Sequence, residues 1–170
     1  MVRRRGDRPG VALRAALFTV MLTAGIPAVH PLIIAVSGGY GFVIDQGDLT
    51  GGAGSGFVPT HESTDDAVLI DITDTTGDSD AWQIQVHKED AAWISGLDLL
   101  LLRTGAGSGT GSISGGDVLQ VELTDTDQVF FEGAGDRTAI PVRLILDGVS
   151  VLIPADTYST VLYITVIDSP

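Results

Sequence analysis

The chain has 170 residues, no cysteine, no asparagine and a formal net charge of −13. Disulfides and Asn-linked glycans are therefore excluded, so apolar burial and backbone pairing must supply the stability. Five of the nine basic residues and one acidic residue precede position 38, which leaves 4 basic and 21 acidic residues in the remainder. Because such a surface repels phosphates and anionic lipid head groups, we expect no nucleic-acid partner and, for the mature chain, no membrane partner.

Residues 1–37 have the layout of a secretory signal peptide. A cluster of arginines precedes a largely apolar run over Ala15–Val36, and small residues occupy the −3 and −1 positions of a cleavage site after Ser37. This pattern predicts a secreted or cell-surface protein. The 22-residue run is also long enough to span a bilayer, so an uncleaved anchor is the alternative, although Pro27 and Pro31 interrupt it.

A short apolar segment and a glycine-rich stretch follow the predicted leader and together make up residues 38–56. The composition of Gly47–Gly56 predicts a flexible tether. In the apolar segment, Tyr40, Phe42 and Ile44 alternate with other residues and would share one face of a strand. This face is our candidate for binding a partner by strand addition. The alternative is that the segment forms the first strand of its own domain.

Residues 57–170 contain several runs in which apolar and polar side chains alternate, which is typical of half-buried strands. The runs are 68–73, 82–87, 119–123 and 142–147, and two further runs, 99–102 and 161–167, are apolar on both faces. Clusters of Gly, Asp, Ser and Thr separate the runs, and Asp147–Gly148 predicts a hairpin turn. We therefore predict an all-β domain, an antiparallel Greek-key β-sandwich of the immunoglobulin-like or jelly-roll kind.

The sequence contains none of the catalytic patterns that we sought. It lacks a thiol, the Gly-x-Ser-x-Gly spacing of a nucleophile elbow and the Gly-x-x-x-x-Gly-Lys phosphate loop, so we predict that the protein is not an enzyme. We expect no cofactor, with Ca²⁺ as the one candidate metal. Asp74, Asp78 and Asp80 fall in a single turn-forming segment, and Ca²⁺ prefers carboxylate and carbonyl oxygens.

Three aromatic residues have predictable environments. Ile153–Tyr158 leads into the last apolar run and resembles the tyrosine corner of Greek-key sandwiches, where a tyrosine hydroxyl binds nearby backbone. Tyr158 is therefore assigned a structural role. Trp82 is in phase with the apolar face of its run and is expected in the core. Trp93 lies in a less regular segment and is expected to be exposed. An exposed tryptophan can stack on a sugar ring, so Trp93 indicates a carbohydrate site.

The acidic, cysteine-free sandwich, the short apolar segment before a glycine-rich stretch and the sequence Asp156–Thr160 together resemble secreted β-sandwich fibre or pilus subunits and related surface proteins. This resemblance implies that an N-terminal segment adds as a strand to the next subunit. We therefore expect a non-enzymatic extracellular structural or adhesive protein that binds itself or another cell-surface protein. The alternative is a carbohydrate- or calcium-binding accessory module with a polysaccharide partner.

Overall fold

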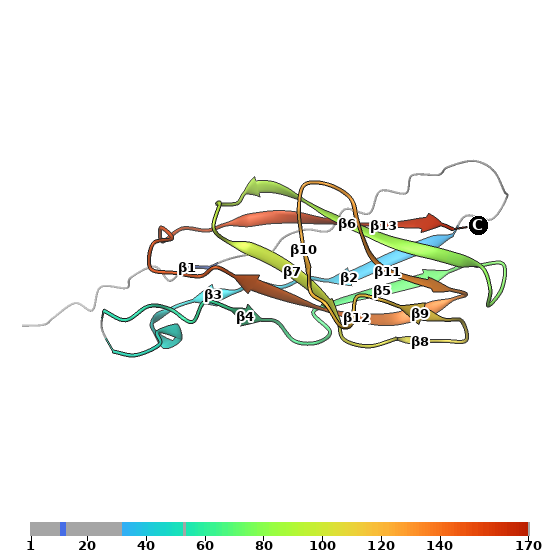
Figure 1. Cartoon of the computed structure of the whole chain (residues 1–170), viewed down its shortest axis with the longest axis horizontal. Helices are drawn as coiled ribbons and strands as arrows, with labels where there is room; N and C mark the ends of the chain where they lie inside the picture. Colours follow the sequence, from blue (N-terminus) through green and yellow to red (C-terminus); the bar gives the residue numbers. More distant parts are fainter. Residues whose placement is uncertain (1–10, 13–31, 53, 170) are drawn as a thin grey trace, which may run out of the picture.

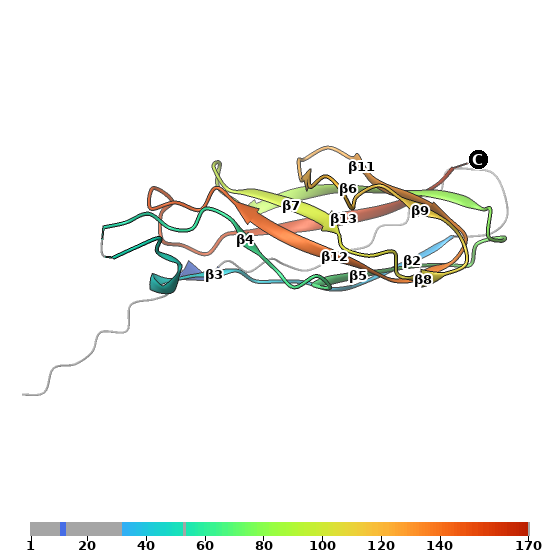
Figure 2. The same cartoon turned by 60° about the horizontal axis from the view of Figure 1, so that its bottom comes forward.

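The computed structural model describes residues 11–12, 32–52 and 54–169, and most of the predicted leader lies outside these ranges. The described chain forms an elongated sandwich of two antiparallel sheets, which Figures 1 and 2 show from two directions. Apart from one short 3₁₀ helix, these residues contain no helix. The predicted all-β sandwich is therefore confirmed.

The larger sheet has seven strands, in the order β10-β7-β12-β5-β2, with β4 and β8 also paired to β12. Its strands are β2 (Ile33–Gly38), β4 (His61–Glu62), β5 (Val68–Thr73), β7 (Asp98–Arg103), β8 (Ser108–Gly109), β10 (Val121–Glu122) and β12 (Arg137–Asp147). The smaller sheet has four strands in the order β13-β6-β11-β9. Its strands are β6 (Ala81–Ala92), β9 (Ile113–Ser114), β11 (Gln128–Ala134) and β13 (Ser159–Asp168). A separate pair joins β1 (Val11–Ala12) to β3 (Val43–Ile44), and the 3₁₀ helix η1 (Gln46–Asp48) follows β3.

Side chains that alternate along the strands fill the space between the sheets. On β5, Val68, Ile70 and Ile72 are fully buried, as are Ile84 and Val86 on β6. Full burial of one such side chain contributes about 1.5–3 kcal/mol, so these two strands anchor the core. They are also two of the runs in which the sequence alternation was clearest.

The connection after β12 differs from the expected hairpin. Strands β12 and β13 lie in different sheets, so Asp147–Gly148 does not join two paired strands, and that prediction is wrong. Gly148 has a φ of 84°, and a Cβ atom built on it would lie 2.1 Å from the carbonyl oxygen of Gly96. The glycine is therefore needed for a left-handed backbone and a close chain approach.

The region before residue 57 also differs from the expected leader, apolar segment and tether. Strand β2 includes Ser37, the last residue of the predicted leader, so cleavage after Ser37 would remove most of this strand. The glycine-rich stretch folds back on itself, because Leu49 forms a β-bridge with Phe57 and Thr50 N donates to Gly56 O at 2.8 Å. Residues 33–52 and 54–57 therefore form ordered backbone contacts of their own.

Candidate functional site

Strand β2 forms one edge of the seven-stranded sheet. It pairs antiparallel with β5, placing Ile34 opposite Ile72 and Val36 opposite Ile70, and it has no partner on its other side among the described residues. Ile34 is 8% exposed and Val36 is half-buried, whereas Ile33 is 43% exposed. Two side chains of β2 therefore cover this edge of the core, while no strand among the described residues pairs with the outer side of its backbone, as is typical of an edge strand.

Glycines follow β2 where the chain leaves the sheet. Gly38 has a φ of 103° and Gly39 a φ of 150°, and a Cβ atom on Gly38 would lie 2.3 Å from the carbonyl oxygen of Ala67. Gly39 N donates to that same oxygen at 2.9 Å. A further glycine stands at position 41. This segment is consequently the glycine-rich connection between β2 and the rest of the domain, in place of the tether predicted at 47–56.

The three residues predicted to bind a partner pack in their own domain. Phe42 is 4% exposed and Ile44 is 8% exposed, and both belong to the core, while Tyr40 is half-buried against it. The rings of Tyr40 and Phe42 meet edge to face with centroids 4.9 Å apart. Only Ile44 lies in a strand, β3, and all three side chains pack against the chain's own core.

The three aspartates of the candidate calcium site act within their loops. Asp80 Oδ2 accepts from Thr76 N at 2.7 Å, Asp78 Oδ1 accepts from Thr110 Oγ1, and Asp74 adopts a φ of 64°. Residues 11–12, 32–52 and 54–169 contain no group of three or more His, Cys, Asp or Glu side chains that could hold a metal ion. The structure thus brings no calcium ligand set together here, and calcium binding stays a prediction.

Tyr158 makes the contact that a tyrosine corner requires. It is 8% exposed, and its hydroxyl donates to Pro154 O at 2.8 Å, four residues back along the chain. Next to it lies an open hollow of about 400 Å³ between the end of β6 and the connection before β13. Six of the residues that line it are Trp93, Ile94, Pro154, Asp156, Thr157 and Tyr158. Trp93 is half-buried, and Trp82 is in the core at 1% exposure.

A polar cluster on the outer face of the smaller sheet was not singled out from the sequence. His87 on β6 stacks on Tyr163 of β13 with ring centroids 4.7 Å apart, and its Nδ1 lies 2.6 Å from Asp127 Oδ1. The Tyr163 hydroxyl donates to Glu89 at 2.8 Å, which raises the pKa of Tyr163. The sequence places His87 and Tyr163 at outward positions of two separate strand-like runs. Only the pairing of β6 with β13 shows that these two residues are neighbours.

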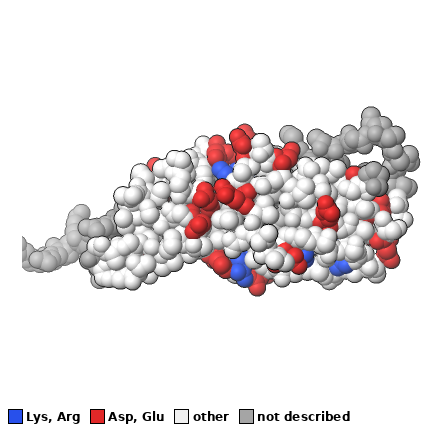
Figure 3. Space-filling view, viewed as in Figure 1, with Lys and Arg blue, Asp and Glu red and all other residues white. Residues whose placement is uncertain are grey.

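Acidic side chains dominate the charge of the surface. In the view of Figure 3 they are spread over the middle and right of the molecule, with few basic groups among them. Arg143 on β12 pairs with Glu62 and Asp65. The hydrogen bond with Asp65 is the main cause of a raised pKa for Arg143. Lys88 and Arg103 also have carboxylate partners, whereas the Arg137 guanidinium donates to a backbone carbonyl. Acidic residues outnumber the cations, so the net field is negative.

Comparisons with known proteins give this chain no relative. No family model, no curated protein and no solved structure matches it. Across the residues that the structure describes, no helix has both the length and the apolar character needed to cross a membrane.

Proposed function

We propose that this protein is a non-enzymatic extracellular structural subunit that assembles by exchange of strand β2 between copies. The observation that carries the proposal is the edge position of β2, which pairs with β5 alone among the described strands of its sheet and overlaps the end of the predicted leader. The strand that donates is therefore residues 33–38, and the region that accepts it is the β5 edge of a second copy.

The free energy needed to detach β2 from its own sheet would be small. It removes one well-buried side chain, Ile34, and the partly buried Val36. At about 1.5–3 kcal/mol for a fully buried side chain, this is a small part of the burial in a sandwich whose β5, β6 and β12 side chains stay in place. The glycines at positions 38, 39 and 41 supply the conformational freedom that lets the strand swing away.

A second copy offers an identical replacement. The β2 strand of a second copy makes the same backbone pairing with β5 and again covers Ile70 and Ile72. The free energy of these contacts is therefore recovered, and the net cost of exchange is the entropy lost on association. Because each chain would donate at one place and accept at another, the contact is heterologous, and chains could continue into an open fibre. Adhesion to another cell-surface protein through the same edge is the related alternative.

The absence of cysteine allows a direct test by introduced disulfides. Ser37 and Leu69 are directly opposite across β2 and β5, within the distance that a disulfide can bridge. In the full chain carrying Ser37→Cys and Leu69→Cys, exchange should produce disulfides between chains, seen as a ladder on a non-reducing gel. The matched control is Gln85→Cys with Thr165→Cys, a pair across β6 and β13 that should link within one chain.

Two outcomes would contradict the proposal. One is a Ser37→Cys, Leu69→Cys variant that forms only intrachain disulfides under conditions where the protein is concentrated. The other is an intact mass showing that the secreted chain starts at Gly38, because β2 would then be absent from the mature protein.

A further inference from the structure

The hollow beside Tyr158 is large enough for a ligand, unlike its neighbour. A second cavity next to it, lined by apolar side chains such as Ile44, Phe57 and Val149, has a volume of about 50 Å³. An apolar space of that size stays dry and has no room for an organic ligand. The hollow of about 400 Å³ is shallow and opens widely to solvent, so it has room for a single unit of a polymer that lies against the surface.

The aromatic wall of the hollow is held rigidly. Trp93 Nε1 donates to Leu97 O at 2.7 Å, which fixes the indole plane. Lys88 Nζ lies 5.6 Å from the centroid of that ring and is itself held by Asp90 at 2.7 Å. Tyr158, which also lines the hollow, is fixed by the hydrogen bond from its hydroxyl to Pro154 O. A rigid wall loses little entropy when a ligand packs against it.

Polar groups stand on the rim next to these rings. Asp156 and Thr157 are both exposed, and Asp156 Oδ1 accepts from Thr157 N at 2.7 Å. A carboxylate has about four acceptor positions, so Asp156 keeps the capacity to accept from a ligand, and the Thr157 hydroxyl can donate or accept. The hollow thus combines apolar ring surfaces with hydrogen-bonding groups at one side.

The charges narrow the class of ligand. Asp156 and the net charge of −13 disfavour an anion. A cation is disfavoured as well, because the Lys88 ammonium lies 5.6 Å from the centroid of the indole and would repel a second positive charge there. A neutral sugar remains, since its C–H faces are apolar and pack on aromatic rings while its hydroxyls donate to carboxylates.

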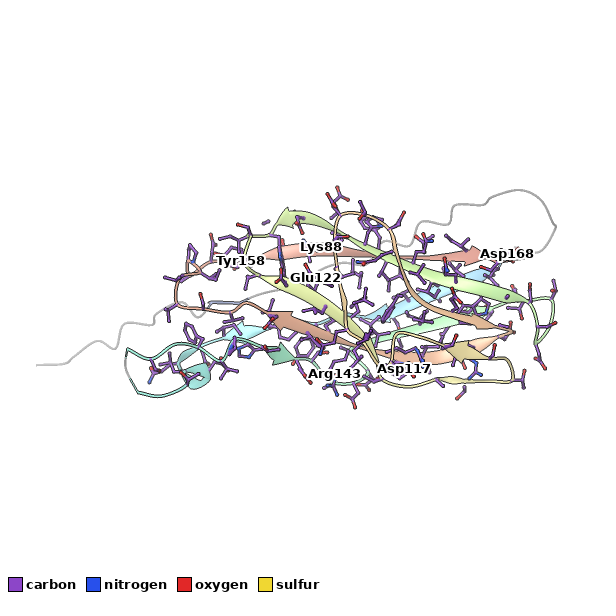
Figure 4. All side chains as sticks on the ribbon, in the orientation of Figure 1. Lys88, Asp117, Glu122, Arg143, Tyr158 and Asp168 are labelled. Atoms are coloured by element: carbon purple, nitrogen blue, oxygen red, sulfur yellow. The ribbon has the colours of Figure 1, made fainter. Side chains whose placement is uncertain are left out.

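We propose that the hollow between Trp93 and Asp156 binds a single neutral sugar unit of a polysaccharide. The site lies near one end of the sandwich, where Tyr158 is labelled in Figure 4, whereas Asp168 lies near the other end. It is separate from the β2 edge, so this proposal does not depend on assembly by strand exchange. A subunit with both features would connect protein filaments to a surrounding carbohydrate layer.

The test is affinity electrophoresis of the full chain in gels that contain a soluble neutral glucan, mannan or galactan. At least one of these should retard the wild-type protein. Asp156→Asn keeps the shape of the side chain but removes its charge, and it should weaken binding about tenfold, as loss of one charge-assisted hydrogen bond predicts. Trp93→Phe reduces the aromatic surface and should weaken binding by a similar factor.

Asp168→Asn is the matched control, because it removes the same charge at the distant end and should change binding less than twofold. Thermal melts establish whether each variant is folded. Because Asp156 is exposed, Asp156→Asn should fold even if Trp93→Phe does not, and the test then rests on Asp156→Asn. Retardation by none of the three polysaccharides would overturn the proposal. Equal binding by Asp156→Asn and wild type would do so too, as would preferential binding of anionic alginate or a polyproline peptide.

Discussion

The two edges of the seven-stranded sheet are held in different ways. At the β10 side, Arg103 of β7 is 4% exposed, and its Nε and Nη1 atoms donate to Gly115 O and Gly105 O, each at 2.8 Å. Its Nη2 atom also pairs with Asp117 at 3.1 Å. At the opposite edge, β2 is held by backbone pairing with β5 and by the apolar contacts of Ile34 and Val36.

The difference shows where this fold can open. A buried guanidinium that satisfies three partners binds its loop strongly, because releasing any partner leaves a buried polar group unpaired. An edge strand held by ladder bonds can exchange those bonds for identical ones on another chain. Under the proposed strand exchange, the first edge therefore stays closed and the second opens.

The largest effect is expected from Arg103→Ala. The substitution removes a buried cation with three polar contacts and should lower the free energy of unfolding by about 3 kcal/mol. Arg143→Ala is the matched control, since Arg143 pairs with Glu62 and Asp65 at the surface, and this substitution should cost clearly less than Arg103→Ala. Urea denaturation measures both. Equal losses would mean that the buried arginine does not secure its edge.

A smaller effect is expected from Ile34→Ala at the β2 edge. Loss of this buried side chain should cost about 1–2 kcal/mol, and Ile33→Ala, at a 43% exposed position, should cost less than about 0.5 kcal/mol. Hydrogen exchange should show faster opening of the β2 and β5 amides in Ile34→Ala while β7 stays protected. Uniform acceleration over both sheets would argue against an independently opening β2.

Tyr158→Phe tests a contact that lies outside both edges. It removes the hydroxyl bond to Pro154 and should cost about 1 kcal/mol without changing exchange of β2. Tyr163→Phe provides the comparison, because the Tyr163 hydroxyl donates to Glu89 on the outer face and its removal should cost less than that of the Tyr158 hydroxyl. An unchanged denaturation midpoint for Tyr158→Phe would mean that the corner contributes nothing.

The sequence predicted the sandwich because period-two alternation is a local signal, and β5 matches the run at 68–73 residue for residue. It also indicated the hydroxyl contact of Tyr158. It missed β2 because Ile33–Val36 continues the apolar run of the predicted leader. A continuous apolar run lacks the alternation that would distinguish a strand from a signal peptide. The hollow at Trp93 and the cluster at His87 depend on which strands become neighbours, and that is a property of topology that local pattern does not contain.

The smallest effect concerns acid, and it tests the loop that follows β5. Asp136 Oδ1 accepts from the Thr75 hydroxyl at 2.7 Å and from Thr75 N at 2.9 Å, and these bonds hold the pKa of Asp136 below its ordinary value of 3.8. A carboxylate with a lowered folded pKa stabilises the fold fully above the unfolded value. That contribution is lost as the pH falls through the lower folded value.

Wild type should therefore be more stable than Asp136→Asn at pH 7, and the difference should shrink only below about pH 3.8. Denaturation at a series of pH values measures it. A difference that stayed constant down to pH 2 would show that the asparagine acts through something other than the lost charge.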